Sequence, residues 1–341
     1  MMDRLFLEVP ALMSRWGLTA FRWEKIKDVF RVETDNGTKN LKISPFNPER
    51  LAFVHGAVQH LILRGFTRMV PLIPTLSGDT YVSSHGYAFS LFDWIEGRQA
   101  DFSYPEELKE STRALAEFHQ CSAGFTPPPG SNMRDLLGKC LRHFEERYQN
   151  LVDFKKQARH IQHDEFARLY LENVDFFLPM AETAIVKLKA SNYTQLVQQA
   201  KFNQTFCHGD PAARNFILTP QGNIFMIDFD STRLDLPIMD LIKFTRRVMK
   251  KHDWNFETAR LIIDAYQEVI PLSPEELDVM RATFYFPQKF WRMSIRHFHR
   301  HNHYSPEREV LKFQKLLEKQ QNMADFQVQF DHYFDSTRYP N

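Results

Sequence analysis

Residues 206–230 read FCHGDPAARNFILTPQGNIFMIDFD, and this stretch decides the fold. Two short apolar runs, Phe216–Thr219 and Ile224–Ile227, flank the turn signal Pro-Gln-Gly-Asn, and this pattern predicts a β-hairpin. The two strands of a hairpin are antiparallel. Asn215, just before the first strand, and Asp228, just after the second, are therefore expected at the same open end, within reach of one ion.

The side chains at this open end have the chemistry of phosphoryl transfer. The amide oxygen of Asn215 and the carboxylate of Asp228 are hard ligands that suit Mg²⁺. Asp210, five residues before Asn215, can accept the proton of a hydroxyl group held near the metal. One base and two metal ligands are central to such a transfer. The alternative is that Asp210 and Asn215 only form turns and that Asp228 only ends a strand.

The rest of the chain divides into a β-rich part and a helical part. After a short helical pattern at 5–16, strand patterns dominate, interrupted by a helix that begins at the N-cap Asn47 and ends at Gly65. Helical patterns dominate after Gly97. The sequence therefore predicts an α+β protein with two lobes, residues 1–95 and 96–341, and a ligand site between them. The expected strands are 21–26, 29–34, 38–43, 80–83 and 87–94, and the other expected helices are 5–16, 105–123, 132–150, 159–190, 237–251, 256–270 and 274–300.

Composition argues against several classes of protein. The 341 residues include 43 Lys and Arg against 42 Asp and Glu, and a net charge of +1 gives no argument for a nucleic-acid partner. None of the 12 glycines lies in a G-x-G-x-x-G or P-loop pattern. The 3 cysteines form no C-x-x-C pair, which fits a reducing compartment. No apolar run reaches the ~20 residues of a membrane span, so a soluble protein made inside the cell is expected.

Phenylalanine is frequent, with 31 residues in the chain. The simplest interpretation is that these rings form the hydrophobic core. The phenylalanines expected to pack around the hairpin are Phe202, Phe206, Phe216, Phe225 and Phe229.

The hairpin and its preceding loop resemble the catalytic and metal-binding loops of the aminoglycoside phosphotransferase and choline kinase superfamily, relatives of the protein kinases. Other segments extend the resemblance along the whole chain. Leu41-Lys42-Ile43 is similar to the third strand of that fold, and residues 92–97, FDWIEG, to the segment that joins its two lobes. Residues 115–119 and 236–241 are similar to helices of its second lobe. The resemblance implies a two-lobed, protein-kinase-like fold with a small antiparallel β lobe and a larger helical lobe.

Three phrases within these segments are most similar to the CotS-type spore coat proteins of endospore-forming bacteria. They are WIEG at 94–97, ALAEFH at 114–119 and HGDPAARN at 208–215. The resemblance implies synthesis in the cytoplasm, a place in the spore coat, and other spore coat proteins as partners.

The superfamily resemblance also implies nucleotide-binding roles. Lys42 would hold the α- and β-phosphates of ATP, the alternative being an exposed strand lysine. The adenine would meet backbone groups of the joining segment, with its side chains forming an apolar slot. The residues of that segment are Phe92, Asp93, Trp94 and Ile95.

The implied catalytic roles belong to the loops on either side of the hairpin. Asp210 would orient and deprotonate the acceptor hydroxyl, and Asn215 and Asp228 would bind Mg²⁺. Asp230 would add a second carboxylate to the metal shell or remain a solvated loop acid. His208 is expected to support the loop by hydrogen bonding rather than to act as a base.

Two features depart from the superfamily pattern. Kinase-like enzymes usually pair the third-strand lysine with a glutamate midway along the next helix, but the only carboxylate between residues 44 and 66 is Glu49, at the helix start. The loop at Lys27-Asp28, between the first two strands, contains no glycine. Both features put tight phosphate binding in doubt.

Two hypotheses therefore stand. The first is an ATP·Mg²⁺-dependent phosphotransferase acting on a hydroxyl group of a small molecule or a coat component. The second is a structural spore coat protein with a kinase-like fold and little or no catalytic activity. The sequence does not identify the acceptor.

Overall fold

The structure, a computed structural model, describes residues 2–161, 163–299 and 306–338. Contacts divide the chain into two compact units, one taken from residues 1–135 and 204–234 and the other from 136–203 and 235–341. The predicted lobes, 1–95 and 96–341, follow secondary structure rather than contacts, and their boundary stays a prediction.

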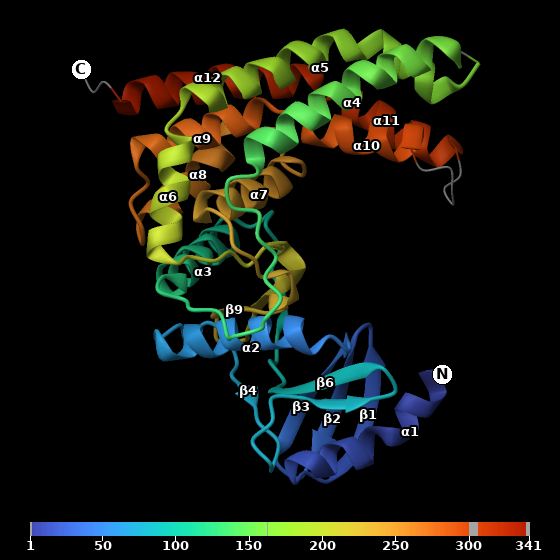
Figure 1. Ribbon diagram of the computed structural model, residues 1–341, viewed down its shortest axis with the longest axis vertical. Helices are drawn as coiled ribbons and strands as arrows, with labels where there is room; N and C mark the ends of the chain where they lie inside the picture. The colour runs from blue at the N-terminus through green and yellow to red at the C-terminus, as the bar shows by residue number, and fades with distance from the viewer. Residues whose placement is uncertain (1, 162, 300–305, 339–341) are drawn as a thin grey trace. The chain divides into compact units, whose positions relative to one another are not determined.

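The first unit is built on an antiparallel sheet with the strand order β1-β2-β3-β6-β4, and β5 also pairs with β6 (Figure 1). The strands are β1 Ala20–Ile26, β2 Val29–Thr34, β3 Gly37–Pro45, β4 Leu72–Ile73, β5 Val82–Ser84 and β6 Tyr87–Asp93. All the strands predicted before residue 95 are present. The two-residue β4 was not predicted, because so short a segment has no periodicity to detect.

Successive side chains along β3 point to opposite faces of the sheet, one apolar and one polar. Leu41 is fully buried against helix α1 (Met2–Met13) and the 3-10 turn Ser14–Trp16, as part of one hydrophobic cluster. Lys42 points to the opposite face, and its partner across the sheet on β6 is Ser90. The other sheet residues of the cluster are Phe30, Val32, Phe89 and Leu91.

Helix α2 (Pro48–Leu63) begins as predicted, because the side chain of Asn47 accepts a hydrogen bond from the backbone N–H of Arg50. Helix α3 (Pro105–Ser122) also belongs to the first unit. Its Glu117 forms an ion pair with Arg68, 2.7 Å away, and the backbone oxygen of Arg68 accepts a hydrogen bond from Met226. This chain of contacts ties α3 to the predicted hairpin.

The predicted hairpin is confirmed. Strands β8 (Phe216–Leu218) and β9 (Ile224–Met226) pair antiparallel, and β7 (Arg98–Gln99) adds a third strand beside β8. The 3-10 turns η2 (Ala213–Asn215) and η3 (Phe229–Ser231) flank the hairpin and place the polar residues at its open end.

The second unit is helical, with all its helices named in Figure 1. Sequence predicted one helix over 274–300, but Pro287 separates two. Proline lacks the N–H that would continue a helix and disfavours helical backbone at the preceding residue, and Phe286 is indeed extended. The helices are α4 Cys140–His160, α5 Glu165–Ala190, α6 Tyr193–Asn203, α7 Pro237–Met249, α8 Phe256–Gln267, α9 Pro274–Tyr285, α10 Gln288–His299, α11 Pro306–Leu317 and α12 Gln320–Arg338. Among the described residues, no helix combines the length and the apolar character needed to cross a bilayer.

The phenylalanines mostly confirm the predicted core, with one exception. Phe206, Phe216 and Phe229 are buried, and Phe225 is half-buried. Phe202 is 88% exposed, so its assignment to the core is wrong. It lies in the last turn of α6, whose buried face is formed by Tyr193, Val197 and Ala200, and its ring points off that face.

Candidate active site

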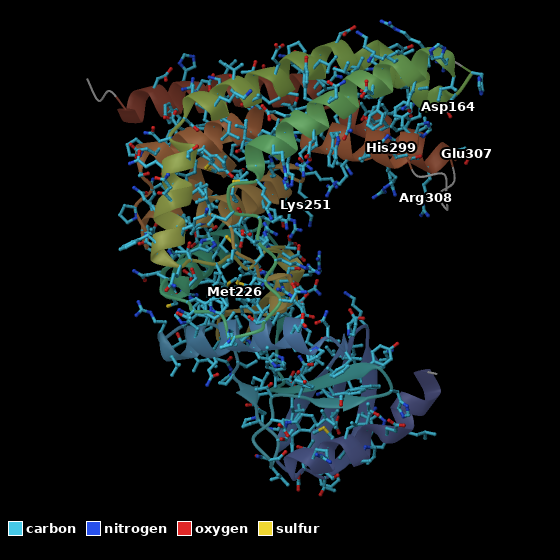
Figure 2. The ribbon with its side chains drawn as sticks, viewed as in Figure 1. Asp164, Met226, Lys251, His299, Glu307 and Arg308 are labelled. Atoms are coloured by element: carbon cyan, nitrogen blue, oxygen red, sulfur yellow. The ribbon has the colours of Figure 1, made fainter. Side chains whose placement is uncertain are left out.

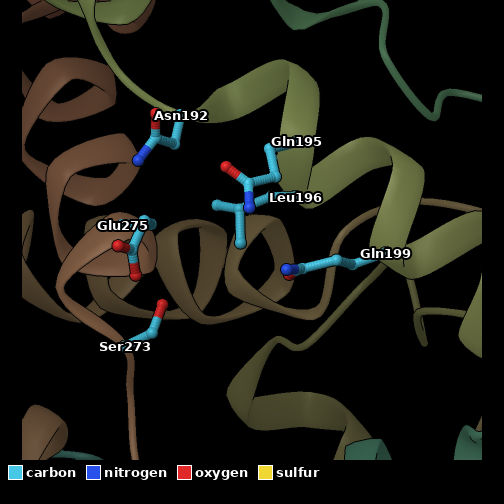
Figure 3. A pocket seen from close by; sticks show the side chains of 6 residues that line it. All are labelled: Asn192, Gln195, Leu196, Gln199, Ser273 and Glu275. Carbon is cyan, nitrogen blue, oxygen red and sulfur yellow. The ribbon is translucent and has the colours of Figure 1, made fainter.

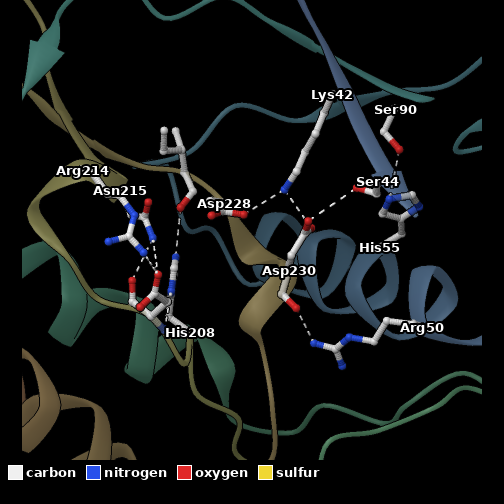
Figure 4. A network of polar contacts seen from close by, with 12 residues as sticks. Lys42, Ser44, Arg50, His55, Ser90, His208, Arg214, Asn215, Asp228 and Asp230 are labelled. Atoms are coloured by element: carbon white, nitrogen blue, oxygen red, sulfur yellow. Dashed lines mark hydrogen bonds and ion pairs between the residues drawn. The ribbon is translucent and has the colours of Figure 1, made fainter. Parts of the chain in front are cut away.

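Lys42 contacts two carboxylates from the loop that follows the hairpin (Figure 4). Its Nζ atom lies 3.0 Å from Oδ1 of Asp228 and 2.7 Å from Oδ1 of Asp230. The lysine side chain is only 17% exposed, whereas the two carboxylates are about half exposed. The polar face of the sheet and the end of the hairpin therefore meet at one charged cluster.

The charges of this cluster stabilise one another. Burial acts to lower the pKa of Lys42, but the carboxylates of Asp230 and Asp228 outweigh it and raise that pKa above its ordinary value. Burial acts to raise the pKa of Asp228, but the charge and hydrogen bond of Lys42 outweigh it and lower that pKa. Both groups are charged near neutral pH.

His208 supports the loop that presents Asp210, as predicted from sequence. The fully buried imidazole bonds to the backbone oxygen of Ile227 through Nε2, at 3.1 Å, and to the backbone N–H of Asp210 through Nδ1, at 3.3 Å. Because the oxygen can only accept and the N–H can only donate, Nε2 carries the proton and Nδ1 accepts. The ring thereby links the loop before the hairpin to the strand end after it.

Asp210 and Asn215 lie together, as their spacing predicted. The side-chain nitrogen of Asn215 donates to the backbone oxygen of Asp210 at 2.8 Å and to its carboxylate Oδ2 at 3.3 Å. Arg214 donates to the same Oδ2 atom. These contacts fix the orientation of the Asp210 carboxylate and of the Asn215 amide.

The segment 207–209, before Asp210, packs closely against the segment 231–233, after the hairpin. Cys207 and Arg233 exchange two backbone hydrogen bonds, of 2.8 and 3.1 Å, and the side chain of Arg233 donates to the oxygen of Gly209. Gly209 has a φ of +82°, and a Cβ atom there would lie 2.1 Å from the backbone oxygen of Ser231. Only glycine fits this position, because it has both a left-handed backbone and no room for a side chain.

Asp228 also has a left-handed backbone, with φ +66° and ψ +68°. This conformation is uncommon for residues other than glycine, and Asp and Asn tolerate it best. At the open end of the hairpin, Ile227 donates to the backbone oxygen of Asn215 at 3.0 Å. Ile227 therefore lies opposite Asn215 across the hairpin, and Asp228 is the next residue along the chain. Asn215 and Asp228 lie at the same open end, as the antiparallel pairing predicted.

Helix α2 supplies a histidine where the kinase pattern has a glutamate. His55 is buried, and its two nitrogens lie 2.9 Å from Oγ1 of Thr80 and 3.3 Å from Oγ of Ser90. Burial lowers its pKa to about 4, so the ring is neutral. The carboxylates that contact Lys42 come instead from Asp228 and Asp230, just after the hairpin.

Arg50, in the first turn of α2, binds the same loop from the other side. It donates through one Nη atom to the backbone oxygen of Asp230, at 2.7 Å, and to that of Thr232. Its guanidinium also lies over the ring of Phe53, 5.1 Å from the centroid. Burial and the charge of Arg134 lower its pKa to about 10.

The segment predicted to meet adenine lies at the end of β6. Phe92 follows two residues after Ser90, the partner of Lys42, and pairs with Asn40 across the sheet. The carboxylate of Asp93 is 2.6 Å from the buried Nζ atom of Lys39. Trp94 donates through its backbone to Thr38 and lies beneath the guanidinium of Arg31, and Ile95 after it is half-buried. The segment thus continues from β6, the strand paired with the lysine strand β3.

Sequence reasoning missed two of these contacts. Arg214 is exposed, and its contact with the Asp210 carboxylate lies in a loop and a 3-10 turn, where four-residue spacing predicts no shared face. Arg50 carries no sequence signal either, because its partners are backbone oxygens 180 and 182 residues away.

A separate pocket of about 200 Å³ lies in the helical unit and contains none of the predicted site residues (Figure 3). Polar side chains dominate its lining, which consists of Asn192, Gln195, Leu196, Gln199, Ser273 and Glu275. Ser273 already accepts the N-cap hydrogen bond of α9, so the pocket has one polar group committed to the fold.

Known proteins resemble this chain over most of its length. Spore coat protein S of Bacillus subtilis (strain 168) is 25% identical over 310 residues, which cover 91% of this chain and 86% of that protein. An aminoglycoside phosphotransferase from Alicyclobacillus acidocaldarius subsp. acidocaldarius DSM 446 superposes with a TM-score of 0.83 at 21% identity, covering 94% of this chain and 96% of that one.

A spectinomycin phosphotransferase, solved with ADP and spectinomycin, has a TM-score of 0.59 at 14% identity and covers 96% of this chain and 98% of its own. These similarities confirm the predicted α+β, protein-kinase-like fold. The phosphotransferase enzyme family itself matches residues 17–272, a range that includes β3, the loop around Asp210 and the hairpin. The chain therefore belongs to the phosphotransferase enzyme family.

Proposed function

We propose that this protein is an ATP·Mg²⁺-dependent phosphotransferase that acts on a hydroxyl group of a small molecule or a coat component. The observation that supports the proposal most strongly is the contact of Lys42 with Asp228, at 3.0 Å. This contact supports the proposal because Lys42 is the proposed phosphate-binding lysine and Asp228 a proposed metal ligand, and they come together although 186 residues separate them in the chain.

The nucleotide is proposed to bind along the polar face of the sheet. Lys42 would hold the α- and β-phosphates, and the adenine would meet the backbone at Phe92, Asp93, Trp94 and Ile95. The side chain of Asp93 is bound to Lys39, so this residue would contribute its backbone groups rather than its carboxylate. The spectinomycin phosphotransferase solved with ADP supports a nucleotide site in this fold.

The proposed metal ligands fit Mg²⁺ by their chemistry. Asn215 donates through its amide nitrogen to Asp210, which leaves the amide oxygen to face a cation. Asp228 offers a carboxylate that is 44% exposed, and Asp230 is the third proposed ligand. Oxygen ligands of this kind are the ones Mg²⁺ prefers. When bound, the metal would neutralise charge on the transferred phosphoryl group.

Asp210 is the proposed base. Its carboxylate, held by Arg214 and Asn215, would orient the acceptor hydroxyl and accept its proton as the hydroxyl oxygen bonds to the γ-phosphorus. The bond from that phosphorus to the β,γ-bridging oxygen breaks, and ADP leaves with the bonding electrons. The products are ADP and a phosphate monoester.

Two variants test the proposal on the purified protein. Binding of ATP is measured by calorimetry with Mg²⁺, and release of ADP is measured with a panel of hydroxyl acceptors. We expect Lys42→Ala to lose nucleotide binding, and Asp210→Asn to keep it while losing ADP release. Unchanged ADP release in Asp210→Asn would overturn the assignment of the base.

The alternative function is a structural spore coat protein with little or no catalytic activity. Two observations favour it: the similarity to Spore coat protein S, and the missing helix glutamate, which leaves Lys42 paired with the loop carboxylates. This alternative predicts that wild type releases no ADP with any acceptor.

Under either function we propose synthesis in the cytoplasm and a final place in the spore coat with other coat proteins. Antibody detection of the protein in coat extracts would test this localisation.

A further inference from the structure

Helix α10 in the second unit has one strongly basic face. Its sequence, QKFWRMSIRHFH, contains no Asp or Glu. Lys289, Arg292 and Arg296 are spaced by three and four residues, so they share one face of the helix. The opposite face is apolar, with Phe290 and other side chains buried, so packing turns the basic face outward.

Two further cations, from outside α10, act electrostatically on Lys289. Lys250 follows the end of α7, and Lys312 lies on α11, which packs beside α10 (Figure 1). Both side chains are exposed. Figure 2 labels Lys251, in the turn after α7, His299, at the end of α10, and Arg308, on α11. We call the set Lys250, Lys289, Arg292, Arg296 and Lys312 the cationic cluster.

The positive charges of the cluster act on the ammonium group of Lys289. Burial, followed by the charges of Lys250, Arg292, Arg296 and Lys312, lowers its pKa to about 8. The lysine also lies in the first turn of α10, where the helix dipole disfavours a positive charge. The lone protein therefore bears an electrostatic cost at this position, which an anion would relieve.

No carboxylate compensates the charges at the centre of the cluster. Across the described part of the chain, neither Lys289 nor Arg292 forms an ion pair with an acidic side chain. The pKa of Arg292 is lowered by burial and by the charges of Arg296 and Arg247. Its side chain is nevertheless exposed, so its donors are accessible from solvent.

The start of α10 is held rigidly beneath the cluster. Arg246 donates to the backbone oxygens of Thr283 and Phe286, which closes the break between α9 and α10. Arg147 donates to Oε1 of Gln288 at 2.7 Å and lies 4.4 Å from the ring centroid of Trp291. The basic side chains therefore project from a fixed platform, which lowers the entropy cost of binding.

We propose that the cationic cluster is a binding site for a ligand that carries a phosphate group. Guanidinium groups match the planar oxygen pairs of phosphate, and lysines add charge without a fixed geometry. Lys289, Arg292 and Arg296 lie within two turns of one helix face, an arrangement that suits one multiply charged group rather than an extended polymer. The site lies in the helical unit, and it does not depend on the proposed phosphoryl transfer.

Inorganic pyrophosphate, without metal and at low salt, is the probe for this site. Calorimetry is expected to give one site on wild type and a loss of affinity of about tenfold or more in the double variant Lys289→Gln/Arg292→Gln, since two charge-assisted contacts are removed. Lys315→Gln, an exposed lysine on α11 outside the cluster, is the matched control and should bind as wild type does. Lys42→Ala should also keep binding, which separates this site from the proposed nucleotide site.

Each other result would overturn the proposal. Loss of pyrophosphate binding in Lys42→Ala, with binding kept in the double variant, would place the anion at the nucleotide site. Binding of a hexaglutamate peptide in preference to pyrophosphate would make the cluster a protein-docking surface. The double variant should melt at an equal or higher temperature than wild type, because repulsion is removed, and a lower melting temperature would show that the cations serve the fold.

Discussion

The Nζ atom of Lys42 lies 2.7 Å from Oδ1 of Asp230, a contact between the third strand of the sheet and the turn after the hairpin. This lysine is held by the loop that would also hold the metal, and not by a glutamate of α2. A bound nucleotide would therefore meet a lysine whose position depends on Asp228 and Asp230 together. Substitutions of the two carboxylates should therefore affect metal binding and nucleotide binding differently.

Asp228→Asn and Asp230→Asn distinguish the two roles. Asp228 ends the hairpin beside Asn215, so its loss is expected to reduce Mg²⁺-dependent ATP binding or turnover by about 10²-fold or more, as losses of charge-stabilising groups at such sites do. Asp230 contacts Lys42 and Ser44 from the following turn, so its loss should weaken ATP binding with a smaller change in Mg²⁺ dependence. Titration of Mg²⁺ at fixed ATP measures both.

Equal loss of Mg²⁺ dependence in the two variants would instead mean that Asp230 binds the metal as directly as Asp228 does. Unchanged metal dependence in Asp228→Asn would show that the metal assignment is wrong. Ser44→Ala is the matched control, because its hydroxyl contacts Asp230 only at 3.5 Å and its loss should change neither quantity.

Arg50→Met tests the contact of α2 with the loop. Arg50 donates to the backbone oxygens of Asp230 and Thr232, and hydrogen bonds from charged donors contribute about 1.5–3 kcal/mol each. We expect the free energy of unfolding to fall by about 3 kcal/mol or more in urea titrations. Arg64→Met, an exposed arginine just after the same helix, should change it by less than about 0.5 kcal/mol. Similar losses in both variants would contradict a specific role for Arg50.

Local sequence patterns were sufficient for the hairpin and the groups around it. The turn between β8 and β9 fixes the register, and the register alone brings Asn215 beside the strand end that leads to Asp228. The start of α2 was equally predictable, because Asn47 makes its cap within three residues. Both features rest on contacts between residues that are close in the chain.

The contacts that sequence did not predict depend on the tertiary fold. Lys42 pairs with Asp230, and Arg50 donates a hydrogen bond to the backbone of the same loop. Both contacts join residues far apart in the chain, and neither follows from a periodic sequence pattern. The exposure of Phe202 was missed because hydrophobicity indicates only that a ring can be buried, whereas the packing of α6 decides which of its faces is covered.

Gly209→Ala tests the close approach of the two loops. The substitution would place a Cβ atom 2.1 Å from the backbone oxygen of Ser231 in a left-handed backbone, so the loops must separate. We expect the free energy of unfolding to fall by about 3 kcal/mol or more. Gly222→Ala is the matched control, since its φ is +85° but nothing lies within 4 Å of its added Cβ atom, and strain alone should cost about 1–2 kcal/mol. Equal losses would show that the contact with Ser231 is unimportant.

His55 predicts a dependence of stability on pH. Its folded-state pKa of about 4 lies below the ordinary value of 6.5, so between these values the unfolded chain binds more protons than the folded one. Stability is therefore complete above about pH 6.5 and falls as the pH is lowered toward 4. From pH 7 to pH 5 this histidine should cost wild type about 2 kcal/mol.

His55→Gln removes that titration while keeping side-chain groups for Thr80 and Ser90. Urea titrations of both proteins at pH 7 and pH 5 give the difference between their pH responses, in which the other titrating groups cancel. Wild type should lose about 2 kcal/mol more than the variant over this interval, because only wild type must keep a buried imidazole neutral against protonation in the unfolded chain. Parallel losses in the two proteins would mean that folding leaves the pKa of His55 unshifted, and a larger loss in the variant would mean that folding raises it; either result would contradict the prediction.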